Sequence, residues 1–227
     1  MAAKVKVLSA GAVKPGVVPV VAAFERDTGY DIAIEFATAP DIRKRLGGGE
    51  SADVVIAPPD LLDELAKSGS AAAEGVMVGR IGVGVMVRDG GPVPRIATVD
   101  EFKQALLNSQ SIVFNQASTG LYIDSLFKRL GIAAETEAKI TRYADFAAVR
   151  DQVVNGHGSE IGFGATTVII ENAGQGLCYI GPLPAELQNY TTYTAAPTAN
   201  AGYAARALLR YLATPAATAI FTAAGIQ

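Results

Sequence analysis

Two stretches of the chain, residues 4–12 and 111–120, have the same physical form. Each is a short run rich in β-branched residues that ends in small or hydroxylated residues, and a helical pattern follows it. A strand that ends in such a loop and opens a helix presents unpaired backbone N–H groups, and the helix dipole adds partial positive charge there. Two such places in one chain predict an anion held between two lobes, and they indicate a binding protein before an enzyme.

Strand and helix patterns alternate along the whole chain, which predicts mainly parallel sheets with helices on both faces. We expect strands at 5–8, 31–36, 53–57, 77–88, 112–115, 139–143, 160–165, 176–180 and 190–195. We expect helices at 17–28, 40–46, 59–68, 99–108, 121–130, 145–155, 199–212 and 215–224. The run at 77–88 contains Gly79, Gly82 and Gly84; such a strand can bend and cross between two lobes, and an ordinary core strand is the alternative.

The composition bounds the class of protein. A chain of 227 residues is long enough for one large domain or for two lobes of about 100 residues each. Half of the residues are hydrophobic and 18% are charged, which fits a compact globular protein and argues against disorder. The net charge of −3 gives no general reason to expect nucleic acid or an acidic membrane as partner. Any attraction for an anion must therefore be local.

The N-terminal residues and the lengths of the apolar runs indicate where in the cell the protein is expected. No apolar run approaches the roughly 18 residues needed to span a bilayer, and the first residues show no signal peptide. The sequence as written therefore predicts a cytoplasmic protein, or a periplasmic one whose leader has been removed.

Cys178 and His157 are the only cysteine and the only histidine. Cys178 has no partner for an intramolecular disulfide, and we expect a buried, inert thiol within a strand. His157 is expected in a turn at the edge opposite the binding loops. Because neither residue has partners at metal-ligand spacing, we expect no metal site and no cofactor. A Ser-His-Asp triad would need His157, which argues against nucleophilic hydrolysis.

Residues 36–56 resemble, without a gap, the equivalent segment of periplasmic molybdate-binding proteins. Residues 24–29 and 211–226 are similar to the end of that family's first helix and to its C-terminus. The resemblance implies a type II periplasmic-binding fold: an α/β protein with two Rossmann-like lobes joined by two crossing strands. It puts residues 1–82 and 191–227 in one lobe and 83–190 in the other, with the ligand between the lobes at the carboxyl ends of the strands.

The chain departs from this family where hydroxyl groups bind the oxyanion. Ala12 stands where the resemblance implies a serine, Thr38 is followed by Ala39 and Pro40 instead of a run of serines, and Ala165 falls near the family's tyrosine. A tetrahedral oxyanion needs such neutral donors, and each unmet one costs on the order of 1–3 kcal/mol. Molybdate is therefore not the ligand that we expect.

Other polar groups remain at the predicted cleft between the lobes. The residues expected to line it are Ser9, Gly11, Ala12, Lys14, Thr38, Arg43, Ser118, Thr119, Gly120, Tyr122, Thr166 and Thr167. Arginine binds carboxylates through two parallel hydrogen bonds and lysine supplies a point charge, so this set favours a small di- or tricarboxylate. Structural alternatives stay open: Ser118 is also a good helix N-cap, Arg43 lies in a basic run typical of a solvated helix face, and Tyr122 fits a core position.

Three functions follow from this cleft. The first is a solute-binding protein, expected to be a monomer, that delivers a small anion to the membrane component of an ABC transporter. The alternative is an enzyme, because some proteins similar to the molybdate-binding family isomerise aconitate by proton transfer; Lys14, Ser9 or Tyr122 would then be the base. The third is a cytoplasmic ligand sensor. A leader sequence upstream of Met1 would favour transport over the other two.

Overall fold

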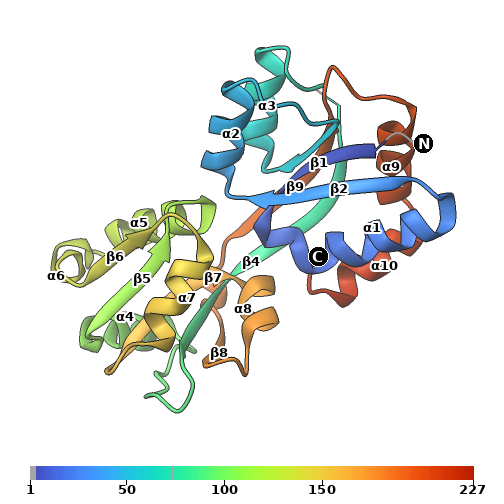
Figure 1. The fold of residues 1–227 in the computed structure, drawn as a ribbon. Helices are drawn as coiled ribbons and strands as arrows, with labels where there is room; N and C mark the ends of the chain where they lie inside the picture. Colours follow the sequence, from blue (N-terminus) through green and yellow to red (C-terminus); the bar gives the residue numbers. More distant parts are fainter. Residues whose placement is uncertain (1–3, 73) are drawn as a thin grey trace. The chain divides into compact units, whose positions relative to one another are not determined.

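The computed structural model describes residues 4–72 and 74–227, and these form two compact units. The first unit contains the described residues up to Ile81 together with Thr192–Gln227, and the second contains Gly82–Thr191. Strands β4 (Val76–Arg88) and β9 (Tyr190–Pro197) carry the chain from the first unit to the second and back (Figure 1). Each unit is a sheet with helices packed on it, which confirms the predicted α/β fold.

The first unit is built on four strands in the order β2-β1-β3-β9. Strand β1 is parallel to β2 and β3, whereas β9 is antiparallel to β3. The other strands of this sheet are β1 (Lys4–Ala10), β2 (Asp31–Ala37) and β3 (Val54–Ala57). The helices of the unit are η1 (Gly11–Val13, a 3-10 turn), α1 (Lys14–Thr28), α2 (Ala39–Gly47), α3 (Pro59–Lys67), α9 (Tyr203–Leu212) and α10 (Pro215–Ala223).

Helix α1 shows why the first unit folds as the sequence predicts. Val17, Val20 and Phe24 recur at helical spacing and are at most 1% exposed. The helix ends where Gly29 takes a left-handed conformation, with φ of 72°, and donates its N–H to the Glu25 carbonyl at 2.8 Å. Gly16 in the first turn leaves room for Phe221 of α10 to pack against the helix backbone.

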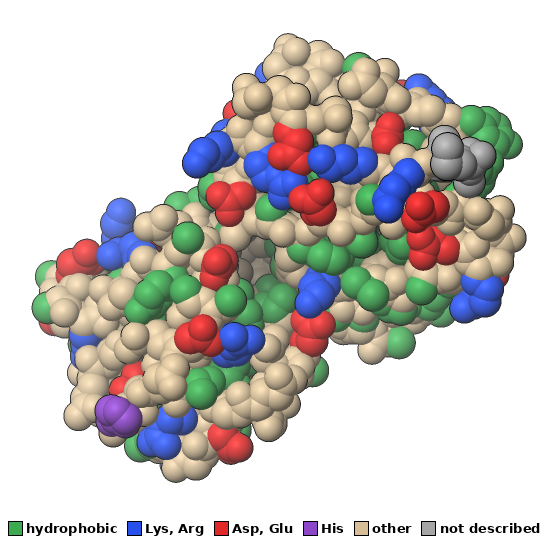
Figure 2. Space-filling model, viewed as in Figure 1, with side chains coloured by type: hydrophobic (Ala, Val, Ile, Leu, Met, Phe, Trp, Pro, Cys, Tyr) green, Lys and Arg blue, Asp and Glu red, His purple; other side chains and the backbone are tan. Residues whose placement is uncertain are grey.

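A charged cluster on the first unit joins β1, β2 and the end of α2. The Arg45 guanidinium donates to Glu50 at 2.6 and 2.7 Å and also to Glu35, and Lys6 Nζ donates to Glu50 at 2.8 Å. Figure 2 shows basic and acidic side chains gathered over this part of the molecule. The hydrogen bonds from Arg45, and then from Lys6, lower the pKa of Glu50 from its ordinary 4.5 to about 2.

This cluster predicts an acid-dependent contribution to stability. Folding lowers the pKa of Glu50. The contribution of its carboxylate to the stability of the folded state is therefore complete above about pH 4.5, and it is lost as the pH falls toward about 2. The denaturation midpoints of wild type and Glu50→Gln should therefore differ at neutral pH and converge on acidification. Glu74→Gln, which changes an exposed glutamate of the same unit, is the control. A difference that stays constant with pH would contradict the assignment.

The second unit is built on the strand order β4-β7-β5-β6, with β8 on the other side of β4. Strand β5 is parallel to β6 and β7, and β4 is antiparallel to β7 and β8. The strands not yet given are β5 (Ser111–Asn115), β6 (Ile140–Tyr143), β7 (Glu160–Ala165) and β8 (Leu177–Pro182). The helices are α4 (Val99–Asn108), α5 (Ser118–Arg129), α6 (Ala133–Glu137), α7 (Phe146–Val154), α8 (Thr166–Asn172) and η2 (Ala185–Leu187, a 3-10 turn).

The core of the second unit consists of two apolar clusters. Successive side chains of β7 point to opposite faces of the sheet, so the strand contributes to both clusters. Phe163 belongs to the cluster of Phe102 and Phe127, whose rings meet it edge to face at 6.0 and 6.2 Å. Gly162, its neighbour along the strand, lies against Met86 in the other cluster, where a side chain would collide with that methionine. Small and large residues therefore alternate to fit α7 and α8 against the sheet.

Two helices of the second unit were not predicted. Helix α6 is short, and α8 has the sequence Thr166-Thr-Val-Ile-Ile-Glu-Asn172, rich in β-branched residues that favour strands. Cys178 is half-buried in β8 rather than fully buried as expected. Among the described residues, no helix is long and apolar enough to cross a membrane.

Candidate functional site

The carboxyl edge of the first sheet carries the first group of predicted residues. Ala10 lies opposite Ala37 in the parallel pair of β1 and β2, so the two strands end side by side. Turn η1 follows β1 and leads into Lys14, the first residue of α1, while Thr38 precedes α2. The structure thus brings Gly11, Ala12, Lys14 and Thr38 to one edge, and we call these four residues the first half-site.

Ser9, Thr38 and Arg43 are among the predicted residues of this unit that have protein partners. Ser9 is fully buried, and its hydroxyl donates to the Ala10 carbonyl at 3.2 Å. Thr38 donates to the Asp41 carboxylate at 2.7 Å and accepts from the Asp41 N–H at 3.4 Å, so it caps α2. Arg43 Nε donates to Glu64 at 2.8 Å, and both side chains are about half exposed (48% and 54%). Lys14 is exposed at the start of its helix.

The carboxyl edge of the second sheet carries the second group. Strands β5 and β7 are parallel neighbours with Val113 opposite Gly162, and helices α5 and α8 follow their carboxyl ends. The residues brought to this edge are Ser118, Thr119, Gly120, Thr166 and Thr167, and we call them the second half-site. Thr167 is 2% exposed, whereas Ser118, Thr119 and Thr166 are half-buried.

The start of α5 differs from the sequence interpretation. Ala117 is the N-cap and no side chain caps the helix, so the alternative role of Ser118 as an N-cap is wrong. Instead, the Asn115 side chain accepts from the Ala117 N–H at 3.2 Å and shapes the turn. A Cβ on Gly120 would overlap the Asn115 carbonyl oxygen, so only glycine lets α5 approach the end of β5 this closely. The hydroxyls of Ser118 and Thr119 are thereby left in the first turn, where the helix N–H groups have no partner within the helix.

Tyr122 holds another part of the unit in place. Its hydroxyl donates to the Leu187 carbonyl at 2.6 Å and accepts from Arg129 Nη2 at 2.9 Å. The Arg129 guanidinium also lies over the Tyr122 ring, 5.4 Å from its centroid. The hydroxyl therefore ties α5 to η2, and its hydrogen and one lone pair are already engaged.

We expect Tyr122→Phe to lower the free energy of unfolding by about 1 kcal/mol, because the Leu187 carbonyl loses its donor. The affinity for the di- or tricarboxylate expected from the sequence, measured by calorimetry beside denaturant unfolding, should stay unchanged. Tyr143→Phe, which removes a hydroxyl that donates to Gln152 at 2.9 Å, is the matched control. An affinity loss in Tyr122→Phe alone would place this hydroxyl on the ligand.

The remaining sequence candidates for chemistry lie elsewhere. His157 is exposed in a bend between α7 and β7, at the amino end of that strand, as predicted. Within residues 4–72 and 74–227, no three His, Cys, Asp or Glu side chains come together as a metal site would require.

Comparisons with known proteins agree with this architecture. An aconitate isomerase from a Pseudomonas species is 32% identical over 232 residues, which cover 97% of this chain and 86% of that protein. The periplasmic molybdate-binding protein of Azotobacter vinelandii superposes with a TM-score of 0.80 at 19% identity over 98% of both chains. The sulfate-binding protein of Mycobacterium tuberculosis gives 0.75 at 17% identity, over 98% of this chain and 86% of that one.

The two structural likenesses show the fold. The sequence match is more specific, because the model of the bacterial extracellular solute-binding proteins matches residues 5–227. That match begins inside β1 and includes both units with both half-sites, so the chain belongs to the family of bacterial extracellular solute-binding proteins.

Proposed function

We propose that this protein binds a small di- or tricarboxylate. The observation that carries the proposal is the relative at 32% identity over 97% of the chain, which is named for aconitate, a tricarboxylate. The molybdate-binding and sulfate-binding proteins share the fold at 19% and 17% identity. Each half-site, taken by itself, has groups suited to a carboxylate.

The first half-site suits a carboxylate through charge. Lys14 supplies a compact positive charge at the first residue of α1, where the helix dipole adds to it. Gly11 has open space where a side chain would stand, so an anion can approach the backbone of the turn. Arg43 would have to leave Glu64 to bind a carboxylate here.

The second half-site suits a carboxylate through neutral donors. The hydroxyls of Ser118, Thr119 and Thr166 follow the ends of neighbouring strands, and α5 opens without a capping side chain. Hydroxyls and helix-start N–H groups satisfy carboxylate oxygens without adding net charge. A tetrahedral oxyanion is less suited to the first half-site, because Ala12 offers it no hydroxyl.

The family membership favours carriage of this ligand to the membrane component of an ABC transporter. A ligand screen by thermal unfolding tests the proposal: citrate, aconitate and tricarballylate are compared with molybdate, tungstate and sulfate. A ligand at 100 times its dissociation constant adds roughly 2.7 kcal/mol of stability, so binding is readily seen. Stabilisation by carboxylates is expected, and stabilisation by molybdate or tungstate alone would overturn the proposal.

The name of the 32% identical relative favours a second candidate, an isomerase acting on the same ligand. In such a reaction a base removes a proton from the methylene carbon, the double bond shifts along the chain, and a proton is returned to the former alkene carbon, so no atom is gained or lost. Lys14 is the base that we favour, because it supplies an amine at the first residue of α1, next to the end of β1.

Proton exchange separates the two candidates. trans-Aconitate is incubated with the protein in heavy water and followed by proton NMR. Loss of the methylene signal together with appearance of the cis isomer would show catalysis, and saturable binding without exchange would show a carrier. Lys14→Arg keeps the positive charge but is a far weaker base, so it should retain binding and lose any exchange.

A further inference from the structure

Asn115 is a polar residue at the second half-site that the sequence did not predict as a ligand contact. It is the last residue of β5 and lies opposite Tyr143, the last residue of β6. Its backbone carbonyl packs directly against Gly120 of the second half-site. The half-buried side chain of Asn115 therefore stands at the carboxyl edge of the sheet, in the loop that carries Ser118 and Thr119.

One hydrogen bond fixes the orientation of the Asn115 carboxamide. Its Oδ1 accepts from the Ala117 N–H at 3.2 Å. Only the oxygen of a carboxamide can accept from an N–H group, so this contact decides which end of the side chain carries the NH2 group. The NH2 group is on the other branch of the carboxamide and presents two donor hydrogens away from the Ala117 N–H.

This NH2 group is an available donor. Over residues 4–72 and 74–227, no protein atom accepts a hydrogen bond from it. The one buried side-chain nitrogen or oxygen without a partner in these ranges is Arg88 Nε, so the Asn115 NH2 group is open to solvent. Water satisfies the group in the unliganded protein, and a ligand oxygen that replaces the water gains a donor already held in place.

We propose that Asn115 is a ligand-binding residue of the second half-site, whose NH2 group donates to a carboxylate oxygen of the ligand. This inference rests on the proposed carboxylate function and adds a donor to it. The residues of the second half-site are uncharged, and their hydroxyls can donate or accept. The Asn115 NH2 group can only donate, so it favours an ionised carboxylate oxygen, which can only accept.

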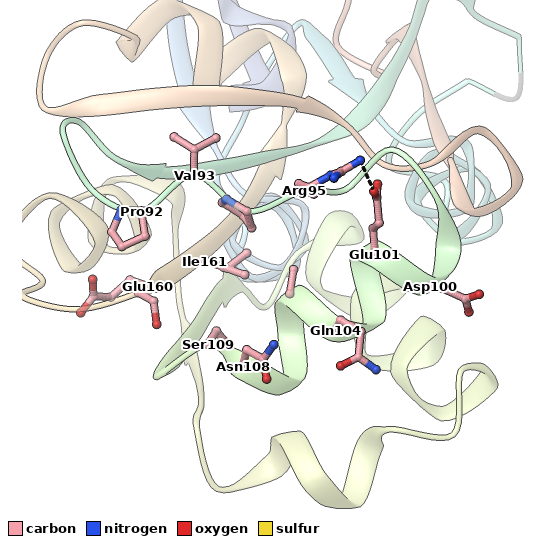
Figure 3. Close-up of a pocket in the computed structure, with 13 residues that line it drawn as sticks. Pro92, Val93, Arg95, Asp100, Glu101, Gln104, Asn108, Ser109, Glu160 and Ile161 are labelled. Atoms are coloured by element: carbon pink, nitrogen blue, oxygen red, sulfur yellow. Dashed lines mark ion pairs between the residues drawn. The ribbon is translucent and has the colours of Figure 1, made fainter.

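A second place in the same unit could attract an anion. A cavity of about 580 Å³ is bounded by α4, by the loop before it and by the amino ends of β5 and β7, so it lies at the opposite edge of the sheet (Figure 3). Arg95 lines it and is 87% exposed, although its guanidinium donates to Glu101 at 2.8 Å. Gln104 lines the same cavity from α4 and has the same carboxamide group as Asn115.

Two substitutions separate a ligand donor from a residue that only shapes the turn. Asn115→Asp keeps an acceptor for the Ala117 N–H but replaces the NH2 group by a carboxylate oxygen, whereas Asn115→Ala removes both. In calorimetric titrations, Asn115→Ala should weaken citrate about tenfold, and Asn115→Asp about a hundredfold or more, because like charges then meet. A turn residue would give the reverse order, so citrate affinity retained in Asn115→Asp would overturn the proposal.

Gln116→Glu and Gln104→Glu are the matched controls, because each also changes a carboxamide to a carboxylate. Gln116 is exposed beside Asn115, and Gln104 is exposed at the cavity. Each should change the citrate affinity by no more than about threefold, since water and salt screen an exposed charge. A loss in Gln104→Glu larger than that in Asn115→Asp would place the anion beside Arg95 and contradict the assignment.

The wild-type protein gives a direct readout that does not depend on the folding of a variant. In 15N-labelled protein, the side-chain NH2 signals of Asn115 should shift and saturate together with citrate binding. Signals that stay in place at saturating citrate would show that this NH2 group does not contact the ligand.

Failure of this inference is distinguishable from failure of the carboxylate function. Citrate binding that Asn115→Asp leaves intact would remove Asn115 from the site and keep the carboxylate function. Binding of sulfate or molybdate alone would overturn the carboxylate function, and Asn115→Asp would then be titrated with that anion. A loss of about a hundredfold would still support the donor role, and no loss would overturn it. A wild-type protein that binds none of these anions would overturn both.

Discussion

A Gly120→Ala protein should be less stable than wild type by about 3 kcal/mol or more, and it should lose the proposed carboxylate binding. The added methyl group would overlap the Asn115 carbonyl oxygen and approach the Phe114 ring at 3.0 Å. Both are fixed, because one is strand backbone and the other is a fully buried ring. Relief therefore requires α5 to move away from β5, which displaces Ser118 and Thr119. Denaturant unfolding and calorimetric titration with citrate measure the two effects.

Gly47→Ala is the matched control for this change. Gly47 is the last residue of α2, has open space around its would-be Cβ and does not have a positive φ. Alanine there should stabilise the protein by roughly 0.5–1 kcal/mol through helix propensity and leave binding intact. Should Gly120→Ala behave like Gly47→Ala, the close approach of α5 to β5 would not be what positions the second half-site.

A Lys14→Met protein should bind citrate at least tenfold more weakly than wild type. Methionine retains the length and the helix propensity of lysine, so mainly the charge is removed. A charge-assisted hydrogen bond contributes about 1.5–3 kcal/mol, which corresponds to a tenfold or larger change in affinity. Calorimetric titration measures the affinity, and thermal unfolding without ligand measures the stability.

Two further substitutions make this result specific. Lys44→Met removes an exposed lysine of α2 and should leave the affinity unchanged. Arg43→Met tests the remaining basic candidate, and we expect a smaller loss than in Lys14→Met because Glu64 holds the Arg43 guanidinium. A larger loss in Arg43→Met would show that this arginine leaves Glu64 when ligand binds.

Elements with strong local signals could be predicted from the sequence. The bounds of α4 and β7 coincide with the predicted ranges, since Thr98 and Glu101 form a helix start and β7 is an unbroken buried run. Helix α8 could not be predicted, because Val168, Ile169 and Ile170 favour a strand locally. Burial of Ile169 in the core of the unit outweighs that propensity.

The candidate site was harder to predict than the fold, and distance along the chain is the reason. The partner of Arg43 is 21 residues away, and that of Tyr122 is 65 residues away. No sequence pattern indicates that residues so far apart are in contact. The side chains of Arg43 and Tyr122 could therefore be interpreted as ligand contacts. The start of α5 was placed three residues late for a similar reason, because Gly120 reads as a loop residue until its contact with Asn115 is seen.

The route of the chain through β4 and β9 has a consequence for the order in which the protein is made. Residues 82–191 are contiguous, so the ribosome delivers the second unit complete, and it can fold during synthesis. The first unit cannot be completed until later. Strand β3 pairs with β1 but gains its second neighbour only when β9 emerges, and Arg80 exchanges backbone hydrogen bonds of 2.7 and 3.0 Å with Gln227, the last residue of the sequence. A nascent chain halted before β9 would therefore hold a folded second unit beside an open β3 edge, the form most exposed to strand-to-strand aggregation.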